Sequence, residues 1–330
     1  MTKATSIYRR AALASGLAAA AILGRPAAAQ TVLRWGETQP AVHPAARMIE
    51  RAAATIRERS GGRIQVQGFP AGQLGSTRDM IEATSSGAQT MVTEGAASLG
   101  QFVPAYSLIE APYLWRDAAH MARALASPVM EDLNRHLVER RQMRVIANTY
   151  YGKRHLTTKD RAVRTAEDMR GFRLRVPEVD TFRAMAEAWG ARATPINFNE
   201  LYLALSQGAV DGQENPLPTI HGAKLFEVQR FLVLTGHIIT PRMVVVNEGA
   251  WMRLPAADRD LVATAVREAA AWQDEELARS EASLIDTLKA SNMTVIEPDI
   301  ESFRRPVLAT VPARFEARWG RGMFERLAAM

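Results

Sequence analysis

The sequence of 330 residues contains no cysteine, which excludes disulfide bonds, thiolate nucleophiles and cysteine-ligated metal ions. It also lacks the glycine-rich turns that bind phosphate groups and the Gly-x-Ser-x-Gly turn of many hydrolases. The six histidines are scattered, without the spacing of a zinc site. We therefore expect neither a metal ion nor a cofactor, and no motif favours an enzyme.

A large excess of charge is missing as well. The formal net charge is +6, and residues 1–29 contribute four basic side chains and no acidic one. In the rest of the chain, basic and acidic residues are interspersed, so there is no basic stripe for nucleic acid. The basic start, the apolar stretch at residues 11–23 and the small residues before Gln30 predict a signal peptide over residues 1–29. The apolar stretch is too short for a comfortable permanent membrane span, and the pair Arg9-Arg10 leaves both Sec and twin-arginine export open.

The remaining 300 or so residues are too many for one small core and favour two lobes of class α/β. The first part alternates strand and helix, which predicts a parallel sheet with right-handed crossovers. The expected elements are strands at 32–35, 63–67 and 90–93, and helices at 44–59 and 77–86.

The second part repeats this alternation and then returns to the first lobe. A short capped helix is expected after Thr165, followed by helices at 179–189 and 198–207. Residues 243–246 are continuously apolar, as in a strand covered on both faces. Residues 256–291 form an unusually long helical pattern without internal glycine or proline. Two consecutive helices are the alternative, because most helices are far shorter.

Two segments predict a receptor for a carboxylate. In residues 171–177, apolar residues alternate with arginines, which indicates a half-buried strand that presents Arg175 just before a proline. In residues 209–216, Asn215 is expected on a turn flanked by Pro216. A guanidinium offers two parallel donors to a carboxylate, and an amide adds a donor and an acceptor. The alternatives are a surface arginine that pairs with Glu178 or Asp180, and a turn-stabilising asparagine.

These segments closely resemble the extracytoplasmic solute-binding proteins of tripartite ATP-independent periplasmic (TRAP) transporters, known as the DctP-type family. The resemblance covers essentially the whole chain after the signal peptide. It rests on Leu-Arg-Val-Pro at 174–177 and Asp-Gly-Gln-Glu-Asn-Pro at 211–216. Further segments in the same order are Gln-Leu-Gly at 73–75, Ala-Pro-Tyr at 111–113, Glu-Leu-Tyr-Leu-Ala-Leu at 200–205 and Phe-Glu-Val-Gln at 226–229.

The resemblance implies a two-lobed periplasmic-binding-protein fold. Each lobe would have a mixed, mostly parallel sheet with helices on both faces, and one long helix would span both lobes. We expect lobe I to comprise residues 30–150 plus about 240–270, and lobe II residues 151–239 plus about 271–330. The implied protein is a periplasmic monomer without membrane insertion of its own. It would deliver a small organic acid to a small and a large integral membrane subunit.

The resemblance also implies ligand-binding residues. Arg175 would bind the ligand carboxylate with help from Asn215, and Arg154 would supply a second cation, although a solvated Lys-Arg-His loop with Lys153 and His155 is the alternative. The other implied cleft residues are Phe198 and Glu94, and the end of the first strand adds Thr38, Gln39 and Trp35.

The ligand itself stays open at this point. A uronate or related sugar acid suits an arginine–asparagine clamp with Glu94 for hydroxyl groups, and a C4-dicarboxylate suits two arginines. Polar anchors of sialic-acid-binding relatives are replaced by Thr38 and Thr77, which makes a large amino sugar acid less favoured. A binding protein of an ABC importer or of a sensor kinase is the nearest rival class, and a periplasmic enzyme is the distant one.

Overall fold

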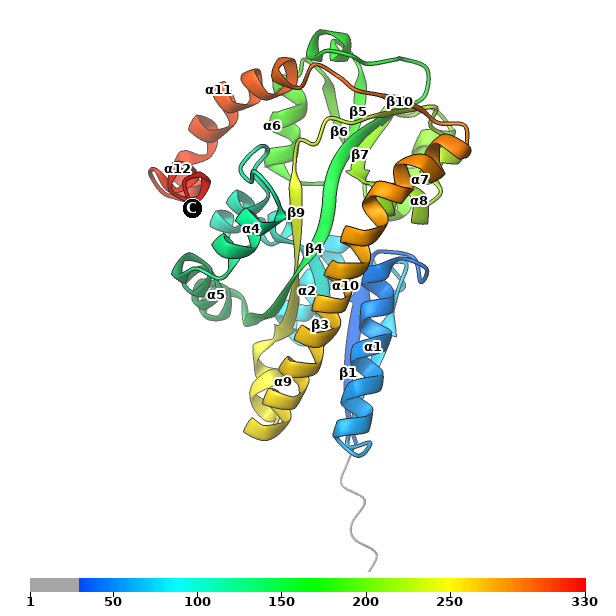
Figure 1. Ribbon diagram of the computed structural model, residues 1–330. Coiled ribbons are helices and arrows are strands. Elements are labelled where there is room, and N and C mark those ends of the chain that lie inside the picture. Colours follow the sequence, from blue (N-terminus) through cyan, green and yellow to red (C-terminus); the bar gives the residue numbers. More distant parts are fainter. Residues whose placement is uncertain (1–29) are drawn as a thin grey trace, which may run out of the picture.

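A computed structural model describes residues 30–330, so the expected signal peptide at residues 1–29 lies outside the described residues. The strands follow the order β2-β1-β3-β9-β4-β7-β5-β6, and β8 pairs with both β4 and β10. Two groups of elements surround the two halves of this path (Figure 1). We use lobe I for the half around β1–β3 and lobe II for the half around β5–β7.

Lobe I is built on parallel pairing of β1 with both β2 and β3, while β9 pairs antiparallel with β3. Helix α2 has the bounds expected from sequence, because Ser76 and Asp79 form a capping box and Gly87 ends the helix at φ 84°. The elements are β1 (Thr31–Glu37), α1 (Pro44–Arg59), β2 (Ile64–Phe69), α2 (Thr77–Ser86), β3 (Met91–Gly95), α3 (Ala96–Leu99), η1 (Pro104–Glu110), α4 (Ala118–Leu125), α5 (Pro128–Arg141) and α9 (Glu248–Arg253).

Two long antiparallel strands connect the lobes: β4 (Met143–Thr158) and β9 (Ile239–Asn247). Every residue of β9 is buried. Its side chains alternate, so Val244 packs with α1 and α10 while Val245 joins the cluster that contains residues of α2 and α5. The prediction of a strand covered on both faces is therefore confirmed.

Strand β4 corrects one expectation. The alternative of a solvated loop at residues 151–155 is wrong, because the strand continues to Thr158 on pairing with β7, β8 and β9. The register shifts between Tyr150 and Gly152, where Gly152 has φ 124°. This irregularity lets one strand pass from lobe I to lobe II and puts Arg154 on a strand.

Lobe II has parallel pairs β5–β6, β5–β7 and β8–β10. The helix expected at 198–207 begins instead as a short 3₁₀ turn, Phe198–Glu200, before α7. The expected capped helix after Thr165 is also a 3₁₀ turn, with its capping box present. The elements are η2 (Ala166–Met169), β5 (Arg173–Val176), α6 (Asp180–Ala188), β6 (Arg192–Pro195), α7 (Leu201–Ser206), β7 (Gly212–Pro216), α8 (Leu217–Gly222), η4 (Leu225–Glu227), β8 (Phe231–Val233), β10 (Thr294–Ile296), α11 (Ile300–Trp319) and α12 (Met323–Ala328).

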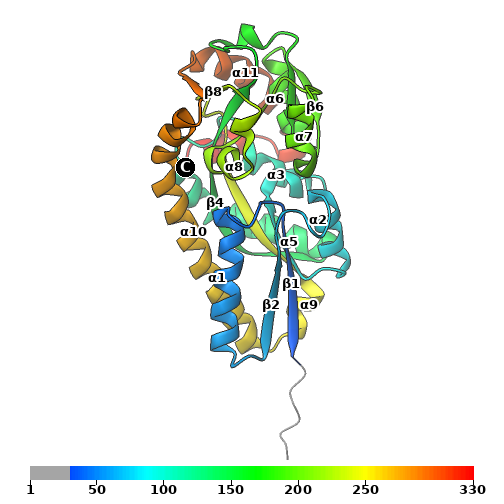
Figure 2. The same ribbon diagram turned by 90° about the vertical axis from the view of Figure 1, so that its right-hand side faces the viewer.

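Helix α10 (Ala256–Ala290) runs along both lobes, as Figure 2 shows. It packs against α1 in lobe I, along β4, and against α8 in lobe II. The prediction of one long helix that spans the lobes is confirmed, and two separate helices are excluded. Within residues 30–330, no helix is long and apolar enough to cross a membrane.

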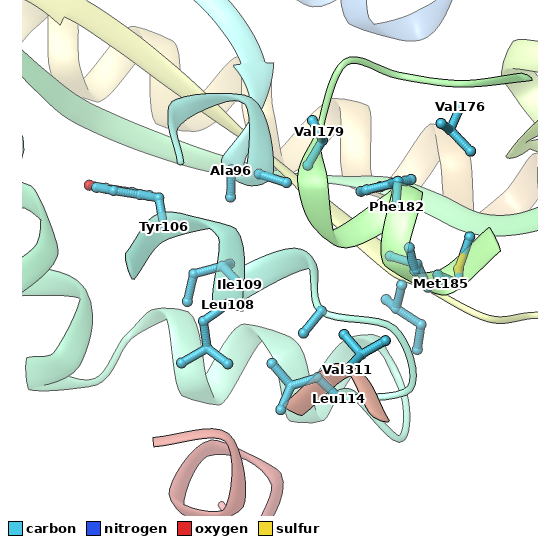
Figure 3. Packing of buried hydrophobic residues seen from close by; sticks show 14 of the residues in the cluster. Ala96, Tyr106, Leu108, Ile109, Leu114, Val176, Val179, Phe182, Met185 and Val311 are labelled. Atoms are coloured by element: carbon cyan, nitrogen blue, oxygen red, sulfur yellow. The ribbon is translucent and has the colours of Figure 1, made fainter. Parts of the chain in front are cut away.

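The largest hydrophobic cluster is shared by the lobes. Figure 3 shows Ala96, Ile109 and Leu114 of lobe I near Phe182 and Met185 of helix α6 in lobe II. Helix α11 packs against both α6 and η1 and contributes Val311 to this cluster. Apolar contact between the lobes is therefore extensive in this conformation.

Candidate functional site

A cavity lies between the lobes, at the carboxyl ends of parallel strands from both. This is the usual place for ligand sites in open α/β sheets. Lobe I contributes residues at the ends of β1 and β3, and lobe II contributes the ends of β5, β6 and β7. The lining includes Thr38, Gln39, Thr77, Glu94, Gly95, Glu110, Tyr151, Arg154, Arg175, Phe182, Ile196, Phe198, Asn215 and Arg242.

Arg175 lies on β5 with only 3% of its surface exposed. Its Nε and Nη2 atoms donate to the carbonyl oxygen of Ile196, at 2.9 and 2.6 Å. In residues 30–330, no carboxylate forms a salt bridge with this guanidinium, and Asp180 pairs with Arg318 instead. Burial lowers the pKa of Arg175 to about 10, so the side chain remains a cation at neutral pH. A buried cation without an anionic partner is costly, which makes this residue receptive to an anion.

Arg154 is also buried, but its charge is matched. Its Nε and Nη2 atoms contact the Glu214 carboxylate at 2.5 and 2.8 Å. Burial would raise the pKa of Glu214, but Arg154 and His237 together lower it, and His237 Nε2 lies 2.9 Å from Glu214 Oε2. Arg154 therefore belongs to an internal ion pair at the cavity wall.

Asn215 lies on strand β7, where it pairs with β4, and not on the expected turn; its side chain connects this ion pair with the cavity. Its Oδ1 accepts from Arg154 Nη2 at 3.1 Å, and its Nδ2 donates to Gln213 Oε1 at 2.5 Å. A side-chain amide has two N–H groups, and this bond uses one of them. The second one is available for an acceptor in the cavity.

The structure adds Arg242, on β9, which the sequence analysis missed. Its Nη1 donates to Glu37 Oε1 at 2.7 Å, and its Nη2 donates to the carbonyl oxygen of Thr93. The guanidinium lies over the ring of Tyr151, 5.0 Å from its centroid. Burial opposes the charge, but Glu37 and Glu94 raise the pKa of Arg242. An arginine directly before the continuous apolar run at residues 243–246 is the signal that could have revealed it.

Two buried carboxyl groups, Glu94 and Glu110, line the lobe I side of the cavity. Glu94 Oε1 accepts from Thr77 Oγ1 at 3.1 Å, and Glu94 Oε2 lies 3.6 Å from Arg242 Nη2. Glu110 Oε2 accepts from the backbone N–H of Ala97 at 2.8 Å. Burial raises the pKa of each carboxyl to about 7. Glu110 was missed, although a glutamate in the apolar segment before Ala111-Pro112 was a visible signal.

The remaining sequence candidates separate into two groups. Thr38, Gln39 and the half-buried Phe198 line the cavity. Trp35 does not reach it, because this residue is fully buried in the lobe I core and its Nε1 donates to Thr93 Oγ1 at 2.7 Å. Its position near the end of β1 pointed to the cavity, but the alternation of the strand directs it to the core.

The competing candidates beside Arg154 also lie elsewhere. Lys153 is exposed, and His155 is buried with its Nδ1 accepting from the backbone N–H of Gly236 at 3.2 Å. Neither lines the cavity. Within the described residues, no group of three or more histidine and acidic side chains could hold a metal ion.

The lobes also touch beside the cavity. Gln101 Nε2 of lobe I donates to the carbonyl oxygen of Glu178 in lobe II at 2.9 Å. Gly72 of lobe I lies so close to the Asn199 side chain that an added Cβ would stand 2.3 Å from its Nδ2. The structure therefore represents a closed arrangement of the lobes.

Comparison with known proteins places this architecture in context. Residues 35–316 match the family described as Bacterial extracellular solute-binding protein, family 7. The sialic acid-binding periplasmic protein SiaP of Vibrio cholerae is 33% identical over 278 residues, which cover 84% of this chain and 86% of SiaP.

Two solved structures extend the similarity to three dimensions. A TRAP periplasmic solute-binding protein from a Polaromonas species, bound to D-erythronate, has a TM-score of 0.87 and 32% identity, covering 91% of this chain and 99% of that chain. Another, from Roseobacter denitrificans with bound L-galactonate, has a TM-score of 0.87 and 28% identity, covering 90% and 98%.

Proposed function

The chain belongs to family 7 of the bacterial extracellular solute-binding proteins, the DctP family of TRAP transporters, and from this premise we propose that it captures a sugar acid between its lobes. Arg175 holds the carboxylate of this ligand, and Asn215 assists with its remaining N–H group. The observation that supports this role best is the burial of Arg175 beside the cavity with a backbone carbonyl as its hydrogen-bond partner. A ligand carboxylate would supply the counter-charge.

The polar wall of lobe I supports the sugar-acid class. Glu94 and Glu110 present carboxyl oxygens that accept hydrogen bonds from hydroxyl groups, and Thr38 and Gln39 add further polar atoms. The structural neighbours with bound D-erythronate and L-galactonate each contain a ligand of this kind. Phe198 offers an apolar face for the carbon chain. The C4-dicarboxylate alternative needed a free second cation, and the ion pair of Arg154 with Glu214 speaks against it.

The family and fold are those of solute-binding proteins, and TRAP systems pair such proteins with membrane subunits. We infer that this chain, after removal of residues 1–29, acts in the periplasm as a monomer and delivers its ligand unaltered to a small and a large membrane subunit. We further propose lobe boundaries near residues 150, 240 and 270, a division supported by the passage of β4, β9 and α10 between the lobes.

Binding would proceed from an open form in which Arg175 is hydrated. Closure removes water from the ion pair, which strengthens the attraction but requires both charges to lose hydration. The hydroxyl contacts of the lobe I wall offset that cost, so specificity follows the polar contacts. Bending at β4, β9 and α10 would provide the hinge.

Calorimetric titration with D-erythronate and L-galactonate tests the proposal. Arg175→Ala should weaken binding at least about thirtyfold, because it removes a desolvated charge partner. Arg175→Lys should also weaken it, since an ammonium cannot reproduce the planar fork. Arg192→Ala, which removes an exposed arginine from the neighbouring strand β6, is the matched control and should leave affinity unchanged. Full affinity in Arg175→Ala would contradict the proposal.

A further inference from the structure

The cavity has three buried arginines, but their charges are not equally available. Arg154 is paired with Glu214, and Arg242 is paired with Glu37. Arg175 has only a carbonyl oxygen as its hydrogen-bond partner in the described chain. Arg78 and Glu178 also border the cavity, but both are exposed, and Arg78 pairs with Glu82. The buried wall therefore has one unmatched cation.

The cavity wall that lobe I contributes contains acidic groups instead of an unpaired cation. Glu94 and Glu110 are 5% and 4% exposed, and the fully buried Glu37, which does not line the cavity, is the partner of Arg242. Arg242 Nη1 and Nη2 are already engaged by Glu37 and by the carbonyl oxygen of Thr93. A second ligand carboxylate on this side would find no free guanidinium fork and would lie beside two buried carboxyl groups.

The position of Glu110 is fixed by its surroundings. Its Oε2 accepts from the Ala97 N–H, and its Oε1 lies 2.9 Å from the place where a Cβ would stand on Gly95. Gly95 thus leaves just enough space for the carboxyl group at the cavity wall. Burial raises the pKa values of Glu94 and Glu110 to about 7, so near neutral pH these carboxyls exchange hydrogen bonds with hydroxyl groups in either protonation state.

We propose that Glu110 and the Glu37-paired Arg242 are specificity-determining residues that admit a sugar monocarboxylate and reject the dicarboxylate of the same carbon chain. This inference rests on the proposed function, because it assigns the far end of the ligand whose carboxylate Arg175 holds. A hydroxyl-bearing end donates to Glu110 and Glu94 and accepts from the edge of Arg242. A carboxylate end meets like charge in a desolvated site, which is strongly unfavourable.

The test compares ligands that differ only at that end: D-erythronate with the tartrate of the same configuration, and L-galactonate with galactarate. Calorimetric titration at pH 8 should show the monocarboxylate of a pair binding at least roughly tenfold more tightly than its dicarboxylate. Glu110→Gln keeps the acceptor for the Ala97 N–H but removes the charge, so the preference should fall severalfold. Glu37→Gln removes the nearer of the two carboxylates beside Arg242 and leaves only Glu94, so it should shift the preference in the same direction.

Glu131→Gln, at an exposed position on α5 that does not line the cavity, is the matched control and should leave the preference unchanged. Thermal unfolding of each unliganded variant shows whether it folds, and the comparison within the unmodified protein does not depend on any variant. Equal or tighter binding of the dicarboxylates would overturn the inference while leaving organic-acid capture intact. An unchanged preference in folded Glu110→Gln would overturn the role of Glu110. If neither member of either pair binds, the proposed function fails and this inference fails with it.

Discussion

Arg154 and Glu214 form a bidentate ion pair in which the Glu214 side chain is fully buried and the Arg154 side chain is 7% exposed. Glu214 also contacts His237, so the carboxylate joins two neighbouring strands of lobe II to the segment before β9. The guanidinium in turn lies over the ring of Phe182, 5.1 Å from its centroid. Arg154 therefore has a structural role in the cavity wall, and Arg175 is the arginine whose charge is available to a ligand carboxylate.

Breaking this pair from one side should be severe. Glu214→Ala leaves the Arg154 cation buried without a partner, and we expect a loss of about 3–5 kcal/mol in the free energy of unfolding. Urea denaturation measures this loss. Glu268→Ala breaks the exposed ion pair with Arg59 and should cost far less, because water already screens that pair. Equal losses in the free energy of unfolding for the two substitutions would show that burial of the Arg154–Glu214 pair does not increase its contribution to stability.

The carboxyl group of Asp274 on α10 should make stability fall as pH rises. Its Oδ1 accepts from the backbone N–H of Tyr150 at 2.7 Å, and burial raises its pKa to about 7. The unfolded chain releases this proton near pH 4, so between pH 4 and pH 7 the folded state binds more protons. The favourable contribution is complete below pH 4 and is lost as pH rises through 7.

Asp274→Asn keeps the acceptor for Tyr150 and removes the titration. Between pH 5 and pH 8, the free energy of unfolding of the wild type should fall relative to this variant by on the order of 2 kcal/mol. Other titrating groups are common to both proteins and cancel in the difference. Asp286→Asn, an exposed position on the same helix, should follow the wild type at both pH values. Parallel pH profiles for wild type and Asp274→Asn would contradict the assignment.

Gly152 should tolerate no side chain. Its φ of 124° is a conformation that other residues rarely adopt, and an added Cβ would lie 2.7 Å from Cβ of Pro216. Gly152→Ala should therefore destabilise the protein by about 1–3 kcal/mol in urea denaturation. Gly62→Ala is the control, because Gly62 has φ 79° but nothing lies within 4 Å of its added Cβ. A smaller loss at Gly152 than at Gly62 would show that contact with Pro216 is unimportant.

The hydrogen bond from Gln101 to the carbonyl oxygen of Glu178 joins the two lobes beside the cavity, and we expect it to break when they open. Gln101→Ala should raise the Kd for a bound sugar acid roughly threefold to tenfold, because the ligand dissociates faster while its association rate stays the same. Stopped-flow fluorescence of the tryptophans measures this rate. Gln67→Ala, at an exposed position on β2, should leave it unchanged. A slower association with unchanged dissociation would contradict a role in the closed state.

The elements predicted best from sequence have local determinants. Helix α2 begins at a capping box and ends at a glycine, and α10 shows its length because no glycine or proline interrupts it. The course of β4 was missed because its partners β7, β8 and β9 lie far along the chain. The pairing that keeps residues 151–155 in a strand is therefore not visible in the local pattern.

The same distinction applies to the cavity. Arg175 and Asn215 lie in segments whose residue pattern indicated a carboxylate receptor, and the structure brings both to one cavity. Arg242 was missed because its partner Glu37 lies 205 positions away in the sequence. A glutamate in residues 211–216 could be read as an internal partner for an arginine, but not for Arg154 in particular, since Arg154 and Glu214 are 60 positions apart.

Within residues 30–330, three segments pass from one lobe to the other: the paired strands β4 and β9, and helix α10, which packs along β4 (Figures 1 and 2). Because these three connections lie side by side, they resist rotation of one lobe about the long axis of the connections, but they still allow the lobes to bend apart. Opening should therefore be a hinge motion of one lobe relative to the other about a single axis. A membrane partner that contacts both lobes at once would fit only one angle between them, and would thereby distinguish the ligand-bound protein from the ligand-free one.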